Sequence, residues 1–294
     1  MADVAKRPVV VGVDGSASAA QAVRWAAREA VRRDAPLVLV HTTAAVPAAA
    51  PHAVALGAYR DALTEQGHRW LAEASATALE AAPEAEVSTE LTGGWAAEQL
   101  IGRSASAELV VLGSRGLGGF TGLVVGSIAV AVTTHGHCPV VVVRGPDART
   151  EPRQDGPVVV GVDGSPASRA AISFAFRAAA SLDVPLVAVH AWSDLPTDVW
   201  DLIADWQTIQ EQESKALNER LADHLAQYPG VTVEQVVTRD RPAHTLLAQA
   251  ENAQLVVAGS RGRGGFRGLL LGSTSQALIH HAPCPVAIVP SPRP

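Results

Sequence analysis

The stretch PVVVGVDGS covers Pro8–Ser16, and the same nine residues return as PVVVGVDGS at Pro157–Ser165. In both places a run of β-branched residues ends in Gly-Val-Asp-Gly, which is typical of a strand that runs into a tight turn. An apolar run without polar alternation indicates a strand covered on both faces, as in a parallel sheet. The distance between the copies is far longer than a solenoid repeat. The chain therefore contains a duplicated domain.

The duplication continues through the rest of the chain. The string GSRGLGGFTGLVVGS at 113–127 returns as GSRGRGGFRGLLLGS at 259–273. Between the copies lies a polar segment that contains glycine and proline, the composition of a linker. We expect a first domain at 1–146, a linker at 147–156 and a second domain at 157–294.

Strand-like and helix-like segments alternate within each copy. In the first copy we expect strands at 9–14, 37–42, 87–91, 109–113 and 139–143, with helices at 18–33, 56–82, 95–104 and 127–135. Consecutive βαβ units with right-handed crossovers form doubly wound sheets. The sequence therefore predicts an α/β protein of two tandem doubly wound, five-stranded parallel-sheet domains, each with strand order 3-2-1-4-5.

The composition excludes several classes of protein. The 294 residues are 48% hydrophobic and carry a formal net charge of −6, without the basic stripe of a nucleic-acid binder. No apolar run approaches the roughly 20 residues of a membrane span, and the start has no secretory layout. We therefore expect a cytoplasmic protein. Cys138 and Cys284 occupy matching places before an apolar run, which indicates two small buried residues more than a disulfide.

A binding site is expected at the carboxyl ends of the strands. In a doubly wound sheet, ligands bind where the strand order reverses, here between strands 1 and 4. Strand 1 runs into Asp14 and strand 4 into Gly113, so the aspartate and the glycine string meet there. Asp163 and Gly259 meet in the same way in the second copy. The sequence thus predicts two matched sites.

The glycine string has the character of a phosphate-binding loop. A helix N-terminus offers unpaired N–H groups and a partial positive charge, and glycine permits close approach of a phosphate. Ser127 and Ser273 stand at the helix starts, where each can cap the helix or donate to a phosphate, while Arg115 and Arg261 add positive charge. The string is not a Walker A loop, because no Gly-Lys-Ser/Thr follows. It is not a Rossmann fingerprint either, because it follows strand 4.

The spacing Gly-x2-Gly-x9-Gly-Ser resembles the ATP-binding signature of the universal stress protein family. Gly113, Gly116, Gly126 and Ser127 fill it once, and Gly259, Gly262, Gly272 and Ser273 fill it again. VGVDGS and LVLVH also match that family, and the likeness covers nearly the whole chain. It resembles the tandem-domain type of mycobacteria and related actinobacteria, with an adenine nucleotide alpha hydrolase-like fold.

The resemblance implies one ATP in each domain, with Mg²⁺. The nucleotide-binding residues of the first domain would then be Gly12, Asp14, Thr42, Gly113, Ser114, Arg115, Gly116, Gly118, Gly119, Gly126, Ser127 and Ile128. Those of the second would be Gly161, Asp163, Ala191, Asp194, Gly259, Ser260, Arg261, Gly262, Gly264, Gly265, Gly272, Ser273 and Thr274. The aspartates after strand 1 would contact the nucleoside or its metal. The backbone after strand 2 would meet adenine, and the loops would hold the phosphates.

The copies differ at the expected adenine ends. Asp194 follows strand 2 of the second copy, within reach of a ribose, where the first copy has Ala45. Trp95 of the first copy aligns with Arg241 of the second. We therefore expect the two sites to differ in affinity.

These patterns favour a nucleotide-dependent regulator in stress response, dormancy or growth control. The family implies pairing through strand 5, between chains or within one, and we expect a regulatory protein partner. The alternative is a slow Mg-dependent ATPase or another ATP-using enzyme of the same fold group, although no dedicated base or acceptor site is evident. Relatives that activate substrates with ATP carry Ser-Gly-Gly-x-Asp-Ser after strand 1, which VDGSAS and VDGSPAS lack. A scaffold with vestigial sites is a third hypothesis.

Other conspicuous residues have structural interpretations. His41 and His190 end strand 2, where packing at the crevice edge is favoured over catalysis. His135-Gly-His137 has metal-like spacing but no evident third ligand. Trp192, Trp200 and Trp206 are expected to pack on the sheet or a partner, and the acidic, Gln-rich helix at 205–227 to present a solvated face.

Overall fold

A computed structural model describes residues 6–43, 53–117, 125–145, 150–192, 206–262 and 271–292 of the chain. The chain divides into two compact units, Met1–Glu151 and Pro152–Pro294. Each unit has five strands and its own helices, so each is described by itself.

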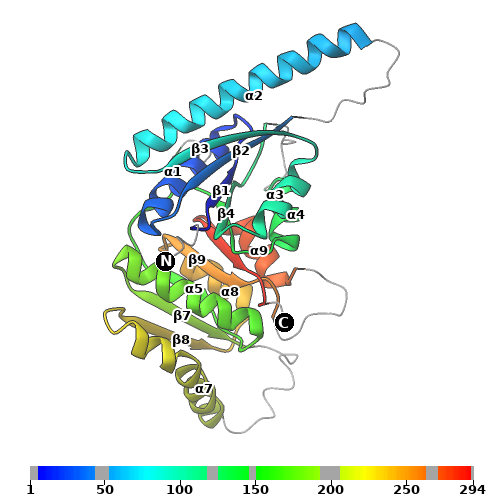
Figure 1. The fold of residues 1–294 in the computed structure, drawn as a ribbon. Helices are drawn as coiled ribbons and strands as arrows, with labels where there is room; N and C mark the ends of the chain where they lie inside the picture. The colour runs from blue at the N-terminus through cyan, green and yellow to red at the C-terminus, as the bar shows by residue number, and fades with distance from the viewer. Residues whose placement is uncertain are drawn as a thin grey trace. The chain divides into compact units, whose positions relative to one another are not determined.

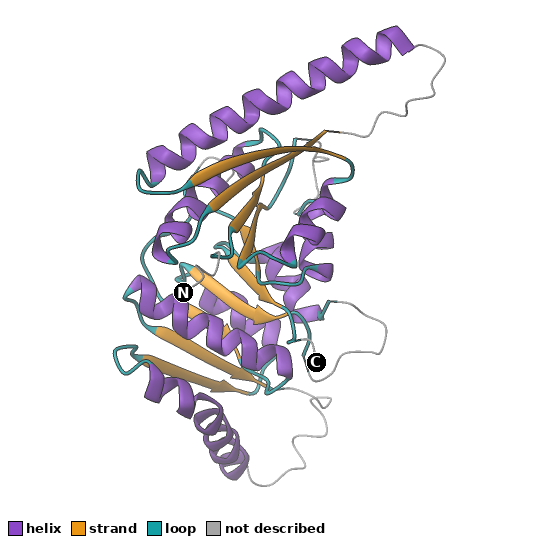
Figure 2. Ribbon diagram, in the orientation of Figure 1, coloured by secondary structure: helices purple, strands orange, loops and turns teal. Residues whose placement is uncertain are grey.

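The first unit is a doubly wound parallel sheet (Figure 1). Its strands are β1 (Val9–Gly12), β2 (Leu37–Thr43), β3 (Val87–Gly93), β4 (Leu109–Gly113) and β5 (Val140–Val143). They lie in the order β3-β2-β1-β4-β5, and every neighbouring pair is parallel, which confirms the predicted order. The helices are α1 (Ala17–Arg32), α2 (Ala53–Ala81), α3 (Ala96–Ser104) and α4 (Ser127–His135). Helices α1 and α2 pack together on one face, and α3 and α4 on the other (Figure 2).

The second unit repeats this architecture. Its strands are β6 (Val158–Gly161), β7 (Leu186–Ala191), β8 (Val233–Thr238), β9 (Leu255–Gly259) and β10 (Val286–Val289), in the order β8-β7-β6-β9-β10. The helices are α5 (Pro166–Leu182), α7 (Trp206–Gln227), α8 (Pro242–Ala250) and α9 (Ser273–His281). Again α5 and α7 share one face, while α8 and α9 share the other. Each copy of the duplicated sequence thus forms five strands in the same order.

The turn after the first strand of each unit sets where the following helix begins. The predicted strand 9–14 ends at Gly12, because Gly15 takes φ +79° and turns the chain away from the sheet. Gly164 has the same φ in the second unit. Ser16 then caps α1 by accepting from the Ala19 N–H at 3.1 Å, as the Ser165 side chain does for α5. The aspartate therefore lies in the turn, outside the ladder of the sheet.

The central strands form the core of each unit. Val9, Val11, Val158 and Val160 are fully buried, as expected for strands covered on both faces. Cys138 and Cys284 are buried free thiols, as predicted; burial raises the pKa of each to about 12. At neutral pH both thiols stay protonated, so they act as small apolar residues.

Candidate functional site

Asp14 joins two distant loops at the carboxyl ends of β1 and β4. Its Oδ1 accepts from the Ser16 N–H at 3.0 Å, and its Oδ2 accepts from the Leu117 N–H at 3.1 Å. In the second unit, Asp163 Oδ1 accepts from the Ser165 N–H at 2.9 Å, and the Ser165 hydroxyl donates to the Arg261 carbonyl at 3.2 Å. The turn after the first strand and the glycine string therefore meet in both units.

Each glycine string is closed by a hydrogen bond between its two ends. The Gly126 N–H donates to the Ser114 carbonyl at 2.8 Å, and the Gly272 N–H donates to the Ser260 carbonyl at 2.8 Å. Each string therefore leaves its sheet and returns to the same point, where α4 or α9 begins. Some predicted site residues lie outside the described residues: Gly118, Gly119, Asp194, Gly264 and Gly265.

The first two glycines of each signature are required by the folded chain itself. A Cβ on Gly113 would lie 2.6 Å from the Ser18 backbone, and one on Gly116 would lie 2.6 Å from Asp14 Oδ2. In the second unit, a Cβ on Gly262 would lie 2.5 Å from Asp163 Oδ2. Close contacts within each unit therefore already disfavour a side chain at these glycines, independently of any ligand.

The last glycine of each signature is different. Gly126 and Gly272 have φ of −71° and −70°, which any residue adopts, and among the described residues added Cβ atoms would meet nothing closer than 3.8 and 3.5 Å. They are the N-caps of α4 and α9 and offer no side-chain acceptor. Ser127 and Ser273 are the first helical residues, so the suggestion that they cap the helices is wrong. The fold does not explain why these two positions lack a side chain.

A cleft of about 530 Å³ opens at this end of the first unit. It lies between the ends of β1, β2 and β4 and the starts of α3 and α4. Many residues singled out from the sequence line it: Gly12, Asp14, Thr42, Gly113, Arg115, Gly116, Gly126, Ser127 and Ile128. Ser114 is instead buried, with its Oγ 3.5 Å from Ser18 Oγ.

Sequence reasoning missed most of the apolar lining. These residues are Val13, Ala19, Val40, Ala96, Leu100, Leu112, Leu117, Val125 and Ala129. Most of them belong to runs typical of an ordinary core, although Leu117 and Val125 lie inside the glycine string and Val13 lies between Gly12 and Asp14. His41, expected at the crevice edge, also lines the cleft.

The cleft combines an apolar region with a positively polarised end. Val40, Ala96 and Leu100 lie on the side of β2 and α3, whereas Arg115 and the N-terminus of α4 lie on the other. Burial, together with the nearby Arg115 charge, lowers the pKa of Arg144. Arg115 therefore supplies a positive charge at that side of the cleft. This arrangement suits a ligand with a flat apolar part and an anionic part.

The second unit places its predicted residues equivalently. Gly161 ends β6 against α8, where an added Cβ would lie 3.0 Å from Leu246 Cδ1. Ala191 ends β7, and Ser260 is buried after β9. Arg261 is exposed, and Thr274 follows the N-terminal Ser273 of α9.

The two histidines at the ends of the second strands are packed, as predicted. His41 Nδ1 lies 2.7 Å from the Val13 carbonyl, and His190 Nδ1 lies 2.6 Å from the Val162 carbonyl. Because a carbonyl only accepts, each Nδ1 is the donor. Both rings are buried, so they tie β2 to β1 and β7 to β6 beside the site.

The model of the universal stress protein family matches residues 6–144 and again residues 156–290. The chain belongs to this family. Universal stress protein Rv2623 of Mycobacterium tuberculosis (strain ATCC 25618 / H37Rv) is 39% identical over 284 residues, which cover 95% of each chain. A universal stress protein of Mycolicibacterium smegmatis (strain ATCC 700084 / mc(2)155) is also 39% identical over 284 residues, 96% of each chain. As a member of the family, the protein is of the tandem type, with two such domains.

A solved structure supports the fold over the whole length. The universal stress protein from Archaeoglobus fulgidus DSM 4304 aligns with a TM-score of 0.70 and 20% identity, covering 97% of this chain and 98% of that one. Within the described ranges, no helix has the length and apolarity that crossing a bilayer requires. In the same ranges, no three His, Cys, Asp or Glu side chains gather as a set of metal ligands.

Proposed function

We propose that this universal stress protein is a nucleotide-dependent regulator that binds one ATP in each unit. The observation that carries the proposal is the pair of N-cap glycines. The described part of each unit leaves room for a side chain at Gly126 and Gly272, yet each position is a glycine at a helix N-terminus, and Gly126 lines the cleft. A triphosphate approaching the first N–H groups of α4 or α9 needs that space.

The remaining groups fit the rest of a nucleotide. Adenine is proposed to lie on the apolar side, against Val40 and the backbone of Thr42, with Ala191 at the equivalent place in the second unit. Arg115 and Arg261 supply charge near the phosphates. Asp14 already accepts two backbone N–H groups, and a carboxylate has about four acceptor positions. It therefore retains capacity for a ribose hydroxyl or for the Mg²⁺ that accompanies ATP.

In this proposal the protein binds ATP, and the effect of the binding is regulatory. Asp14 links the turn after β1 to the glycine string, so a ligand that contacts it can bias the geometry of both segments. A change of this kind is what a partner protein, or a second copy paired through the fifth strand, would read in a cytoplasmic stress response.

Isothermal titration with ATP and Mg²⁺ tests the proposal. The wild-type chain should bind two ATP. Gly126→Val and Gly272→Val should each remove one site, with affinity at that site falling at least about tenfold (~1.4 kcal/mol). Gly230→Val is the matched control, because an added Cβ there meets open space and the residue lies before β8. All three variants should keep their urea midpoints within about 1 kcal/mol of wild type.

Two outcomes would overturn the proposal. The first is wild-type protein that takes up no ATP with Mg²⁺ present, which would favour a scaffold. The second is steady multiple turnover at rates of order 1 s⁻¹, which are typical of true enzymes. That result would make the protein an ATPase.

A further inference from the structure

Trp95 has no structural role within the described part of the first unit that explains its presence. It occupies the N-cap of α3, where Ser, Thr, Asp and Asn are favoured, and its side chain makes no capping hydrogen bond. It is also 74% exposed, so it contributes little to the core. A large aromatic residue that neither caps nor packs points to a role toward another molecule.

The backbone holds Trp95 beside the apolar side of the cleft. The Gly94 N–H donates to the Thr43 carbonyl at 3.0 Å, which ties the β3–α3 turn to the end of β2. Thr42, one residue before that anchor, lines the cleft, as does Ala96, one residue after the tryptophan. Trp95 therefore lies between two cleft-lining segments.

The second unit changes the chemistry at this position. Arg241, which aligns with Trp95, is the N-cap of α8 and is exposed. The preceding Asp240 accepts from the Arg241 N–H at 2.6 Å, and a hydrogen bond with His244 lowers the pKa of Asp240. The first unit has Gly94 in place of this carboxylate. Its turn carries an aromatic surface where the second unit carries charges.

We propose that Trp95 is the specificity-determining residue of the first cleft and stacks on the base of the bound nucleotide. The inference rests on the proposed nucleotide binding and adds how the base is recognised. Aromatic side chains bind bases by stacking on their π-faces. At the aligned position of the second unit, Arg241 places a guanidinium. There the contact is electrostatic and more sensitive to salt.

The experiment uses full-length chains that carry Gly272→Val, so that only the first cleft binds. Titrations with ATP and with inorganic triphosphate, both with Mg²⁺, measure the affinity of three such chains. One keeps Trp95, and the other two carry Trp95→Ala or Trp95→Phe. Trp95→Ala should weaken ATP on the order of tenfold and leave triphosphate unchanged, because triphosphate has no base. Trp95→Phe should recover most of the ATP affinity, since a phenyl ring also stacks.

Tryptophan fluorescence adds a readout that a structural role would not change. The chain has six tryptophans, and the emission change on ATP binding should disappear in Trp95→Phe although ATP still binds. Equal ATP affinity in Trp95→Ala, or equal losses for ATP and triphosphate, would overturn the inference. If instead the Gly272→Val chain with Trp95 binds neither ligand, the proposed nucleotide site itself fails.

Discussion

Both units carry a histidine near the end of the second strand, His41 and His190, but different side chains cover it. Trp70 lies edge-on to His41 at a centroid distance of 5.1 Å, and an added Cβ on Gly67 would lie 2.7 Å from the His41 ring. The position aligned with Gly67 is Glu213, whose Oε2 lies 2.8 Å from His190 Nε2. The sheet and turns are shared, whereas the helix after the second strand carries different side chains. The histidine therefore packs against an aromatic ring in the first unit and contacts a carboxylate in the second.

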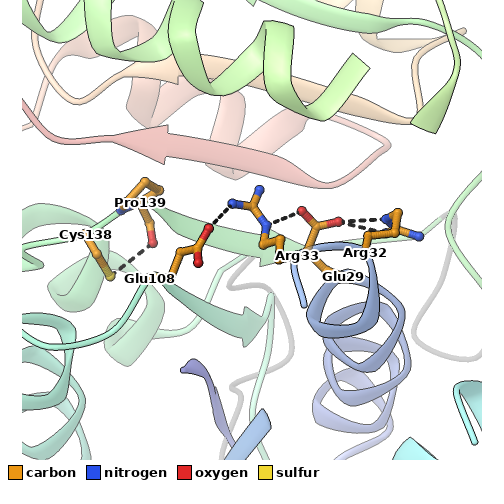
Figure 3. A network of polar contacts seen from close by, with 6 residues as sticks. All are labelled: Glu29, Arg32, Arg33, Glu108, Cys138 and Pro139. Carbon is orange, nitrogen blue, oxygen red and sulfur yellow. Dashed lines mark hydrogen bonds and ion pairs between the residues drawn. The ribbon is translucent and has the colours of Figure 1, made fainter. Parts of the chain in front are cut away.

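A second difference lies at the end of the first helix. Glu29 contacts both Arg32 and Arg33, and Arg33 reaches Glu108 at 2.8 Å (Figure 3). Glu29 and Arg33 side chains are each only 6% exposed. Burial would raise the pKa of Glu29, but the charges and hydrogen bonds of Arg33 and Arg32 outweigh burial and lower it. This network therefore holds an ionised carboxylate inside the first unit.

The second unit fills the aligned positions without these charges. Ala178, Leu182 and Gln254 align with Glu29, Arg33 and Glu108. Ala178 is buried, and the Gln254 amide donates to the Gly156 carbonyl at 2.7 Å. The same backbone thus accepts either an ion network or neutral packing. The stability of the first unit can therefore be compared with that of the second within one chain.

The largest effect is expected from breaking the network on one side. Glu29→Ala should destabilise the first unit by about 3–5 kcal/mol, because it removes a carboxylate that the buried Arg33 guanidinium contacts. Hydrogen exchange with mass spectrometry reads each unit separately. Faster exchange is expected in α1 and β4, with the second unit little changed. Ala178→Gly is the aligned control, which removes one methyl group from α5.

Neutralising Glu29, Arg33 and Glu108 together should recover part of the stability that Glu29→Ala loses. The combined variant Glu29→Ala, Arg33→Leu and Glu108→Gln copies the second unit, and replacing buried ions by apolar groups is often neutral. Because the pKa of Glu29 is lowered on folding, its contribution is complete above its ordinary pKa of about 4.3 and is lost as the pH falls through the folded-state pKa. Stability of the first unit should therefore fall more steeply in acid for wild type than for this variant. Parallel acid curves would contradict the assigned role.

A smaller effect is expected from the histidine partner of the second unit. Glu213→Ala removes the carboxylate whose Oε2 lies 2.8 Å from His190 Nε2 and should cost about 1–3 kcal/mol, the usual cost of losing a buried partner. Exchange should rise in β7 and α7, while β2 and α2 stay unchanged. Glu211→Ala, at an exposed position of the same helix, is the matched control. Equal effects of the two changes would mean that the His190 contact does not stabilise the unit.

The smallest difference is expected where the units are most alike. Ser16→Ala and Ser165→Ala each remove an N-cap and a hydroxyl that donates to the glycine string. Each should cost about 1 kcal/mol, and the two costs should agree within about 0.5 kcal/mol. Thermal or urea unfolding measures the total loss, and exchange assigns it to a unit. A large inequality would show that the two turns are not energetically equivalent.

Much of the fold and part of the site were predictable from the sequence. Strand runs such as 109–113 and the helix 127–135 match the structure, because apolar runs and turn residues act locally. The first strand is shorter than predicted, since periodicity does not reveal the turn that Gly15 makes. Cleft residues such as Leu100 were missed, because an apolar residue in a cleft and one in a core give the same pattern.

The sequence by itself determined the duplication, the strand order and the place where the two strand ends meet. These follow from repeated strings, from hydrophobic runs and from the handedness of βαβ crossovers. Only the tertiary structure decided which glycines are required by contacts inside the folded unit and which are not. A side chain at Gly116 would meet Asp14, whereas nothing in the described residues of the first unit excludes one at Gly126. That distinction depends on contacts between residues far apart in the chain, which no local pattern records.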